Sequence, residues 1–249
     1  MTIGVMLCFT TPAYALNAVT VMADNSMSVA IAEIARDYSR SKQIIVNTSF
    51  AVAGAQEAQI TEGGAADILI TPRQAWIDQL KTRGLIDIYS QTPVAANQLA
   101  LDGPADSPLH IKLSKGFPAA AIIRQMDGEQ AFIVGNPETQ MAGVYGKEAL
   151  RNMGVAGDLE PYTLYIKPMD QMLDMIVKQR GYGIFLTSSV AANDEVLVLD
   201  TFPKNTYHPI IYYAVVIAGD NMNEARKFLE YLKSNDAKKI FRKNGFAEG

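Results

Sequence analysis

The chain has 249 residues, of which 49% are hydrophobic and 19% charged, the composition of an ordinary globular protein with one large core or two modest ones. Its formal net charge is -4, so it lacks the electrostatic footprint of a nucleic-acid-binding protein, and we expect no nucleic-acid partner. Any anion site must therefore use local dipoles and hydroxyl groups.

The first fifteen residues have the pattern of a secretory signal. Residues 3–9 are apolar, and the run Pro12-Ala13-Tyr14-Ala15 ends in an A-x-A pattern suited to cleavage after Ala15. The apolar run is too short to span a bilayer. The only cysteine, Cys8, lies inside this segment, so the mature chain has no thiol. We expect an exported, periplasmic protein.

Strand and helix patterns then alternate along the chain. Period-2 and β-rich runs predict strands at 18–22, 44–49, 67–70, 131–134, 182–186 and 210–217. Apolar stripes at helical spacing predict helices at 28–39, 56–61, 141–152, 169–178, 222–234 and 236–243.

This alternation predicts an α/β fold in which mostly parallel sheets are flanked by helices. Two extended stretches, near 94–101 and 201–211, have the character of crossings between two lobes. We therefore expect one discontinuous lobe from residues 16–97 and 207–249, and a second lobe from residues 98–206. The cleft between them lies at the carboxyl ends of the strands, where α/β folds bind ligands.

Three strand-to-helix junctions carry candidate anion donors. Ser26 follows the first strand, the small-residue loop 52–54 follows the second, and Ala142 begins the helix predicted after 131–134. A helix N-terminus offers free N–H groups and the positive end of the helix dipole, and small side chains such as Gly143 let a ligand approach the backbone. A single junction of this kind is more often only a structural helix start, but three of the same type favour a shared anion site.

Sequence patterns for catalysis are missing. There is no G-x-S-x-G elbow, no cysteine after the signal and no H-E-x-x-H pair. His110 and His208 have no His, Cys or carboxylate neighbours at zinc-ligand spacing. We therefore expect a protein that is not an enzyme and has no cofactor.

Several stretches together resemble one family, the periplasmic molybdate-binding proteins of ABC importers. The likeness runs from about Val19 to Phe246. It rests on Val19-Thr20-Val21-Met22-Ala23 through Ser26, Ser49-Phe50-Ala51, Ala65-Ala66-Asp67-Ile68-Leu69-Ile70 with Trp76, the segment from Gly135 to Leu150, Phe228-Leu229-Glu230-Tyr231-Leu232-Lys233, Ile240-Phe241 and Asn244-Gly245-Phe246.

The resemblance implies a two-lobed, type II periplasmic binding protein that closes on a tetrahedral oxyanion, molybdate or tungstate, and delivers it as a monomer to an ABC permease. The family binds its ligand with hydroxyls, backbone N–H groups and a tyrosine. Carried over by position, the ligand-binding residues are Ser26, Ala53, Gly54, Ala142, Asp170, Leu186 and Thr187, with Ser26 and Ala142 as the oxyanion contacts to molybdate.

This chain departs from the family pattern at two positions. Val52, Ala53 and Gly54 replace a serine-rich loop, and Leu186 stands where the family has its tyrosine. Hydroxyls of Thr187, Tyr145 or Tyr182 are the candidate replacements, and Asp24 and Asp170 would add repulsion if they faced the ligand. Two alternatives follow: the same fold binding a phosphorylated or carboxylated organic anion, and an adhesin-like secreted protein that no longer serves transport.

Overall fold

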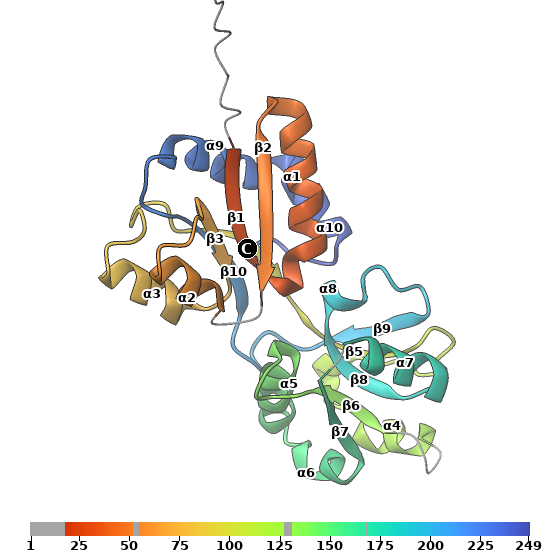
Figure 1. Ribbon diagram of the computed structural model, residues 1–249. Coiled ribbons are helices and arrows are strands. Elements are labelled where there is room, and N and C mark those ends of the chain that lie inside the picture. Colours follow the sequence, from red (N-terminus) through yellow and green to blue (C-terminus); the bar gives the residue numbers. More distant parts are fainter. Residues whose placement is uncertain (1–17, 52–54, 127–130, 168) are drawn as a thin grey trace, which may run out of the picture.

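The computed structural model describes residues 18–51, 55–126, 131–167 and 169–249. Within them the chain forms two lobes, each built on a five-stranded sheet (Figure 1). The first sheet has the order β2-β1-β3-β10-β4 and the second β7-β6-β8-β5-β9. The strands are β1 (Ala18–Asp24), β2 (Ile45–Ala51), β3 (Ile68–Thr71), β4 (Thr92–Asn97), β5 (Leu99–Pro104), β6 (Phe132–Gly135), β7 (Thr163–Ile166), β8 (Tyr182–Leu186), β9 (Val196–Thr201) and β10 (Ile210–Val216).

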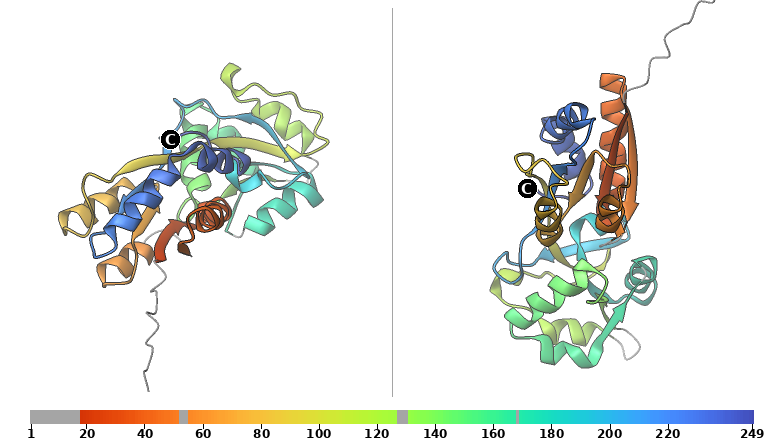
Figure 2. Two further views of the ribbon diagram at one scale, coloured as in Figure 1. Left: turned by 90° about the horizontal axis from the view of Figure 1, so that it is seen from above. Right: turned by 60° about the vertical axis from the view of Figure 1, so that its left-hand side comes forward.

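Helices flank both sheets, and short 3-10 helices join some of the elements (Figure 2). The α-helices are α1 (Ser28–Lys42), α2 (Ala55–Thr61), α3 (Gln74–Thr82), α4 (Ala119–Gln125), α5 (Met141–Asn152), α6 (Ala156–Leu159), α7 (Met169–Gln179), α8 (Thr187–Val190), α9 (Met222–Leu232) and α10 (Asn235–Lys243). The 3-10 helices are η1 (Asn25–Met27), η2 (Leu113–Lys115) and η3 (Glu160–Tyr162). Every strand and helix predicted from the sequence is confirmed to within a few residues. Strands β4, β5, β7 and β9 and helices α3, α4, α6 and α8 were not predicted, and β4 and β5 lie in a stretch that was expected only as an extended crossing.

The expected α/β architecture is confirmed, and parallel pairing joins three strands at one side of each sheet, β2-β1-β3 and β7-β6-β8. Strand β1 pairs in parallel with β2 and β3, and β6 pairs in parallel with β7 and β8. The remaining pairs, β3 with β10, β10 with β4, β8 with β5 and β5 with β9, are antiparallel, so both sheets are mixed. The antiparallel strands are those that carry the chain from one lobe to the other.

Side-chain alternation along the buried strands explains why helices cover both faces of each sheet. In the first sheet Val21 and Ala23 join the core that includes α1 and α9, whereas Met22 between them joins the core under α2 and α3. In the second sheet Ile184 faces the side of α5 and Phe185 the side of α7. A strand buried on both faces has to be apolar at every position, which is why these segments read as continuous hydrophobic runs.

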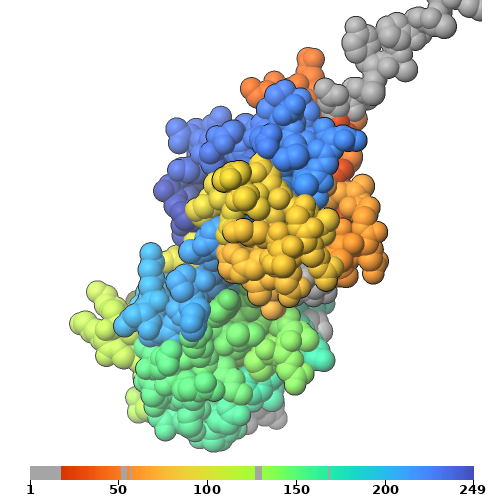
Figure 3. Space-filling view, turned by 90° about the vertical axis from the view of Figure 1, so that its left-hand side faces the viewer, coloured from red at the N-terminus to blue at the C-terminus, as the bar shows by residue number. Residues whose placement is uncertain are grey.

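Two crossings join the lobes. Gln98 alone separates β4 from β5, and residues 202–209 lead from β9 into β10. Strand β1 runs toward the second lobe (Figure 1), and in the space-filling view the first lobe stands directly over the second (Figure 3). Among the residues that the structure describes, no helix is long and apolar enough to cross a membrane.

Candidate functional site

The first half of the candidate site lies where β1 ends against the second lobe. Asp24 is the last residue of β1 and caps η1: its Oδ1 accepts from the backbone N–H of Ser26 at 3.0 Å. The same Oδ1 lies 2.6 Å from Oγ of Ser26, which donates to it. Asp24 is only 9% exposed, whereas Ser26 is half-buried. Ser26 therefore stands at the lobe boundary with its hydroxyl held by Asp24.

A chain of hydrogen bonds runs from Ser26 into the second lobe. Oγ of Ser26 lies 2.7 Å from the hydroxyl of Tyr212 on β10, and this hydroxyl lies 3.5 Å from Nδ2 of Asn97, the last residue of β4. Asn97 in turn donates to Oγ of Ser188 on α8 at 2.7 Å. Burial raises the pKa of Tyr212, and the nearby Asp24 carboxylate raises it further, so this phenol stays protonated.

The second half of the site is the N-terminus of α5. Gly143 has to be glycine, because a Cβ there would lie 2.1 Å from the carbonyl oxygen of Gly135. The turn is fixed by Gln140, whose Oε1 accepts from N–H of Asn136 at 2.7 Å and whose Nε2 donates to the carbonyl of Lys167 at 2.7 Å.

The first intrahelical bonds of α5 are donated by Gly143 and Val144 to the carbonyl of Gln140. The N–H groups of Met141 and Ala142 thus precede the helical ladder, as expected at a helix N-terminus. Ala142 is 4% exposed, so its small side chain is packed inside the lobe.

A cation and a phenol flank these two half-sites. Arg73 follows β3 and precedes α3, and its guanidinium lies 5.1 Å from the ring centroid of Trp76. Tyr145 lies one turn after Ala142 on α5; burial raises its pKa, and the positive charge of Arg73 works against that rise. Arg73 of the first lobe and Tyr145 of the second are therefore close enough to interact electrostatically.

The predicted residues of the second lobe lie at different depths. Leu186 ends β8 and is 4% exposed, and Asp170 is exposed in the first turn of α7. Oγ1 of Thr187 lies 2.7 Å from the carbonyl oxygen of Gly245 and 3.1 Å from Oδ1 of Asn97. A hydroxyl has one proton, so Thr187 already uses its donor within the protein.

The other residues predicted for the signal and the site are the N-terminal segment, the loop after β2 and the two candidate tyrosines. Residues 1–15, Ala53 and Gly54 lie outside the described residues. Tyr182 begins β8, at the end opposite Leu186, and its hydroxyl lies 3.1 Å from Oγ of Ser107. Of the two candidate phenols, Tyr145 is thus the one next to the half-sites.

Short elements hold the two lobes together next to the first half-site. Helix α8 of the second lobe packs next to η1 of the first, so the carboxyl ends of β1 and β8 meet. No group of three or more His, Cys, Asp or Glu side chains within the described ranges is placed to hold a metal ion. The arrangement offers the phenol of Tyr145, backbone N–H groups and the guanidinium of Arg73, a donor set suited to an anion.

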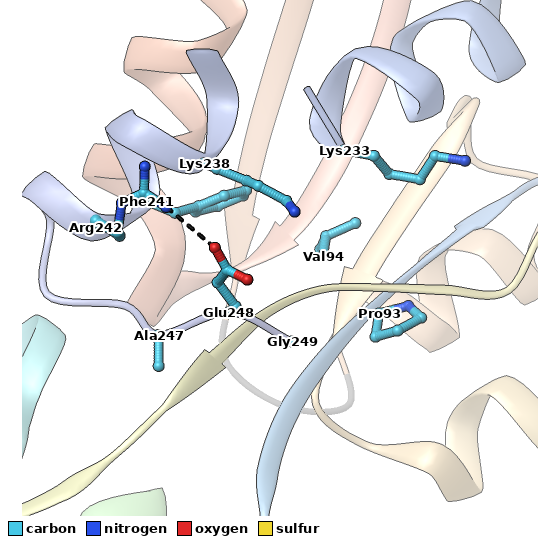
Figure 4. A pocket seen from close by; sticks show the side chains of 9 residues that line it. All are labelled: Pro93, Val94, Lys233, Lys238, Phe241, Arg242, Ala247, Glu248 and Gly249. Carbon is cyan, nitrogen blue, oxygen red and sulfur yellow. Dashed lines mark hydrogen bonds and ion pairs between the residues drawn. The ribbon is translucent and has the colours of Figure 1, made fainter. Parts of the chain in front are cut away.

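A separate basic hollow lies on the first lobe (Figure 4). It is a cavity of about 230 Å³ lined by Lys233, Lys238 and Arg242 together with Pro93, Val94, Phe241, Ala247, Glu248 and Gly249. Arg242 pairs with Glu248 at 3.1 Å, and both side chains are more than half exposed. None of these residues belongs to the strand-to-helix junctions, so this hollow is distinct from the candidate site.

Sequence reasoning missed Arg73, Asn97 and Tyr212. The position of Arg73 could have been found from the sequence, because it follows a predicted strand just as Ser26 does. Ala23 pairs with Ile70 in the parallel register, so Ser26 and Arg73 each lie three residues beyond this pair, at the carboxyl ends of β1 and β3. Tyr212 and Asn97 could not have been found in this way, because a tyrosine in an apolar strand and an asparagine at a strand end are common in any fold.

Comparisons with known proteins show which proteins this chain resembles. A family model described as bacterial extracellular solute-binding protein matches residues 19–247. The chain is 29% identical to the molybdate-binding protein ModA of Escherichia coli, over 92% of this chain and 88% of that protein.

Two solved structures have a similar fold. A substrate-binding domain assigned to a molybdenum ABC transporter of Clostridium difficile gives a TM-score of 0.82 at 23% identity, over 93% of this chain and 99% of that chain. Peb3 from Campylobacter jejuni gives a TM-score of 0.67 at 17% identity, over 93% of this chain and 100% of that chain. A further structure of Peb3 contains L-phospholactate.

Proposed function

Since the chain belongs to the bacterial extracellular solute-binding proteins, we propose that it captures a small tetrahedral oxyanion, molybdate or tungstate, and delivers it to an ABC permease. The ligand class is supported by the Escherichia coli relative, which is named as a molybdate-binding protein and aligns with 92% of this chain. The observation that supports the proposal most directly is the electrostatic interaction of Tyr145 on α5 with Arg73 and Tyr212 of the first lobe, together with the packing of α8 against η1.

In this proposal the oxyanion lies between Ser26 of the first lobe and the N-terminus of α5 in the second. Ala142 contributes its backbone N–H, and the positive end of the α5 dipole favours the negative charge. Tyr145 takes the role of the tyrosine that Leu186 replaces. The first turn of α7 at Asp170 and the loop with Ala53 and Gly54 complete the proposed contacts. Thr187 is left out, because its hydroxyl proton is already used within the protein.

The proposal assigns no catalytic step and no cofactor. Residues 1–15 act as a secretory signal, and the mature chain works in the periplasm as a monomer. Closure of the lobes removes water from the oxyanion, which strengthens its contacts with backbone dipoles. The closed form is then the one that the permease recognises.

A ligand panel read by thermal unfolding tests the proposal. A ligand present at about 100 times its Kd stabilises the folded state by about 2.7 kcal/mol, which for a chain of this size raises the Tm by roughly 5–10 °C. We expect such a rise with molybdate and tungstate. If millimolar molybdate, tungstate and sulfate all leave the Tm unchanged, the oxyanion assignment is wrong.

A second candidate is a phosphorylated or carboxylated organic anion held by the same two lobes. It is favoured by Arg73, whose guanidinium beside Trp76 suits a carboxylate or phosphate group. A structural neighbour of similar fold has been solved with L-phospholactate. Phosphate esters and hydroxy acids therefore belong in the same panel, and a larger Tm rise with them than with molybdate favours this candidate.

A further inference from the structure

The side chains of Asp24 and Ser26 together decide which hydrogen-bond partner the first lobe offers to a ligand. Oγ of Ser26 lies 2.6 Å from Oδ1 of Asp24. An ionised carboxylate can only accept hydrogen bonds, whereas a serine hydroxyl has a single proton to donate. The proton of Ser26 therefore points at Asp24 and is not free for a ligand.

The neighbouring groups fix this direction. Nδ2 of Asn97 is a donor and lies 3.5 Å from the hydroxyl of Tyr212, which is 2.7 Å from Oγ of Ser26. With the Ser26 proton engaged by Asp24, the Tyr212 hydroxyl donates to Ser26. The hydrogen bonds that link Asn97, Tyr212 and Ser26 to one another then all donate in the direction of Asp24. Tyr212 is fully buried and Asn97 is 3% exposed, so water has little access to this chain.

A bound oxyanion meets an unfavourable first lobe in this arrangement. An oxyanion without protons can only accept hydrogen bonds. The Asp24 carboxylate can also only accept them, and the Ser26 hydroxyl, whose proton is engaged, can offer the ligand only a lone pair. Such a ligand has to take the Ser26 proton from Asp24 and also meets the carboxylate's negative charge. A tetrahedral oxyanion that carries one O–H group can instead donate to Asp24 or Ser26 and lose neither interaction.

We propose that Asp24 is a specificity-determining residue, which withholds the Ser26 proton and makes the site prefer a monoprotonated tetrahedral oxyanion over a fully deprotonated one. The proposal rests on the oxyanion site of the proposed function. It changes the order of ligand affinities at that site, because Asp24 raises the affinity for hydrogen phosphate relative to that for molybdate or sulfate. A hydrogen bond to a charged group is worth roughly 10- to 100-fold in affinity, so the preference is measurable.

The test compares ligand affinities of the wild-type chain and Asp24→Ala by calorimetric titration with molybdate, sulfate and inorganic phosphate at pH 7.5. At this pH molybdate and sulfate carry no proton and phosphate is largely monoprotonated. We expect Asp24→Ala to raise the affinity for molybdate relative to phosphate by about tenfold or more. The gain should disappear in the double variant with Ser26→Ala, because it depends on the freed hydroxyl.

Two further variants control the experiment. Asp24→Asn removes the charge but keeps an oxygen that can cap η1, so it serves if Asp24→Ala does not fold. We expect it to raise the affinity for molybdate relative to phosphate by about threefold or more. Asp158→Asn removes one negative charge from the exposed surface of α6, away from Ser26, and should leave the ratio unchanged.

The outcomes separate this inference from the proposed function. If the wild type binds molybdate and the ratio in Asp24→Ala and Asp24→Asn stays within twofold, the role of Asp24 is wrong and the oxyanion receptor stands. If the wild type binds no molybdate but Asp24→Ala does, the role of Asp24 holds and the molybdate assignment fails. If no variant binds any of the three anions, both are wrong.

Discussion

The phenol oxygen of Tyr212 lies 2.7 Å from Oγ of Ser26, although the two residues are 186 positions apart in the sequence. Tyr212 is buried in the first lobe, where its ring makes an edge contact with Phe246 at a centroid distance of 5.7 Å. The strand that returns from the second lobe thus positions the hydroxyl at the end of the first strand. The two segments of the discontinuous lobe are both needed to build the first half-site.

Removal of the Tyr212 hydroxyl should weaken the fold and loosen Ser26. Tyr212→Phe keeps the ring and its packing but leaves Asn97 and Ser26 with one hydrogen bond fewer each. We expect a loss of about 1–2 kcal/mol in the free energy of unfolding, measured by urea denaturation. Tyr213→Phe, on the opposite face of the same strand, is the control. Equal losses for the two variants would show that the Tyr212 hydroxyl has no special role.

The turn before α5 should not tolerate a side chain at Gly143. Gly143→Ala places a Cβ 2.1 Å from the backbone oxygen of Gly135, so either the strand end or the helix start has to move. We expect a loss of about 1–3 kcal/mol in stability and, in the protein that still folds, weaker oxyanion binding. In Gly157→Ala the added Cβ has nothing within 4 Å, so that variant should behave as wild type. Tight ligand binding by Gly143→Ala would argue against α5 as the second half-site.

Arg73 should contribute to anion affinity through its charge. Arg73→Gln removes the guanidinium beside Trp76, and we expect oxyanion binding to weaken by about three- to tenfold at low ionic strength, with a smaller effect at 0.5 M salt because exposed charges are screened. Arg83→Gln, at the other end of α3, removes the same charge farther from the site. If both substitutions weaken binding equally, only the net charge matters and Arg73 makes no specific contact.

Asp102 should make the protein less stable as the pH rises. It lies fully buried on β5, and neither carboxyl oxygen has a well-aligned hydrogen-bond partner among the described residues. Burial raises its pKa well above the usual range, an effect that the backbone of Phe185 offsets only in part. A carboxyl whose folded pKa is raised contributes stability below its unfolded pKa, and this stability is lost as the pH rises through the folded pKa.

Asp102→Asn removes this titration while keeping the shape of the protonated acid. The free energy of unfolding of the variant minus that of the wild type should therefore be larger at pH 8 than at pH 5. Urea denaturation of both proteins at the two pH values measures this difference. A difference between variant and wild type that does not change with pH would mean that Asp102 does not titrate in the native state.

Much of this fold was predictable because its signals are local. Apolar runs and helical stripes placed the central strands and the long helices correctly, and the segment from Gly135 to Leu150 forms the predicted turn and helix. Strands β7 and β9 were missed because edge strands expose half of their residues, as Leu164 and Val198 illustrate. Short strands of this kind lack a clear period.

The candidate site was only partly predictable, for a physical reason. Ser26 and Ala142 stand at strand-to-helix junctions, which leave a pattern in the sequence. The partners that set their chemistry leave no such pattern. The hydrogen bonds of Asn97 and Tyr212 depend on long-range packing, and the proton of Ser26 is directed by a contact that exists only in the folded chain.

The most direct measurement of the central claim is anomalous diffraction at the molybdenum edge from crystals of the wild-type chain grown with molybdate. The proposed clamp predicts one strong peak between the lobes, within about 4.5 Å of both Oγ of Ser26 and the backbone nitrogen of Ala142, the reach of a hydrogen-bonded oxyanion. A peak only at the basic hollow of Lys233, Lys238 and Arg242, or no peak at all, would contradict it.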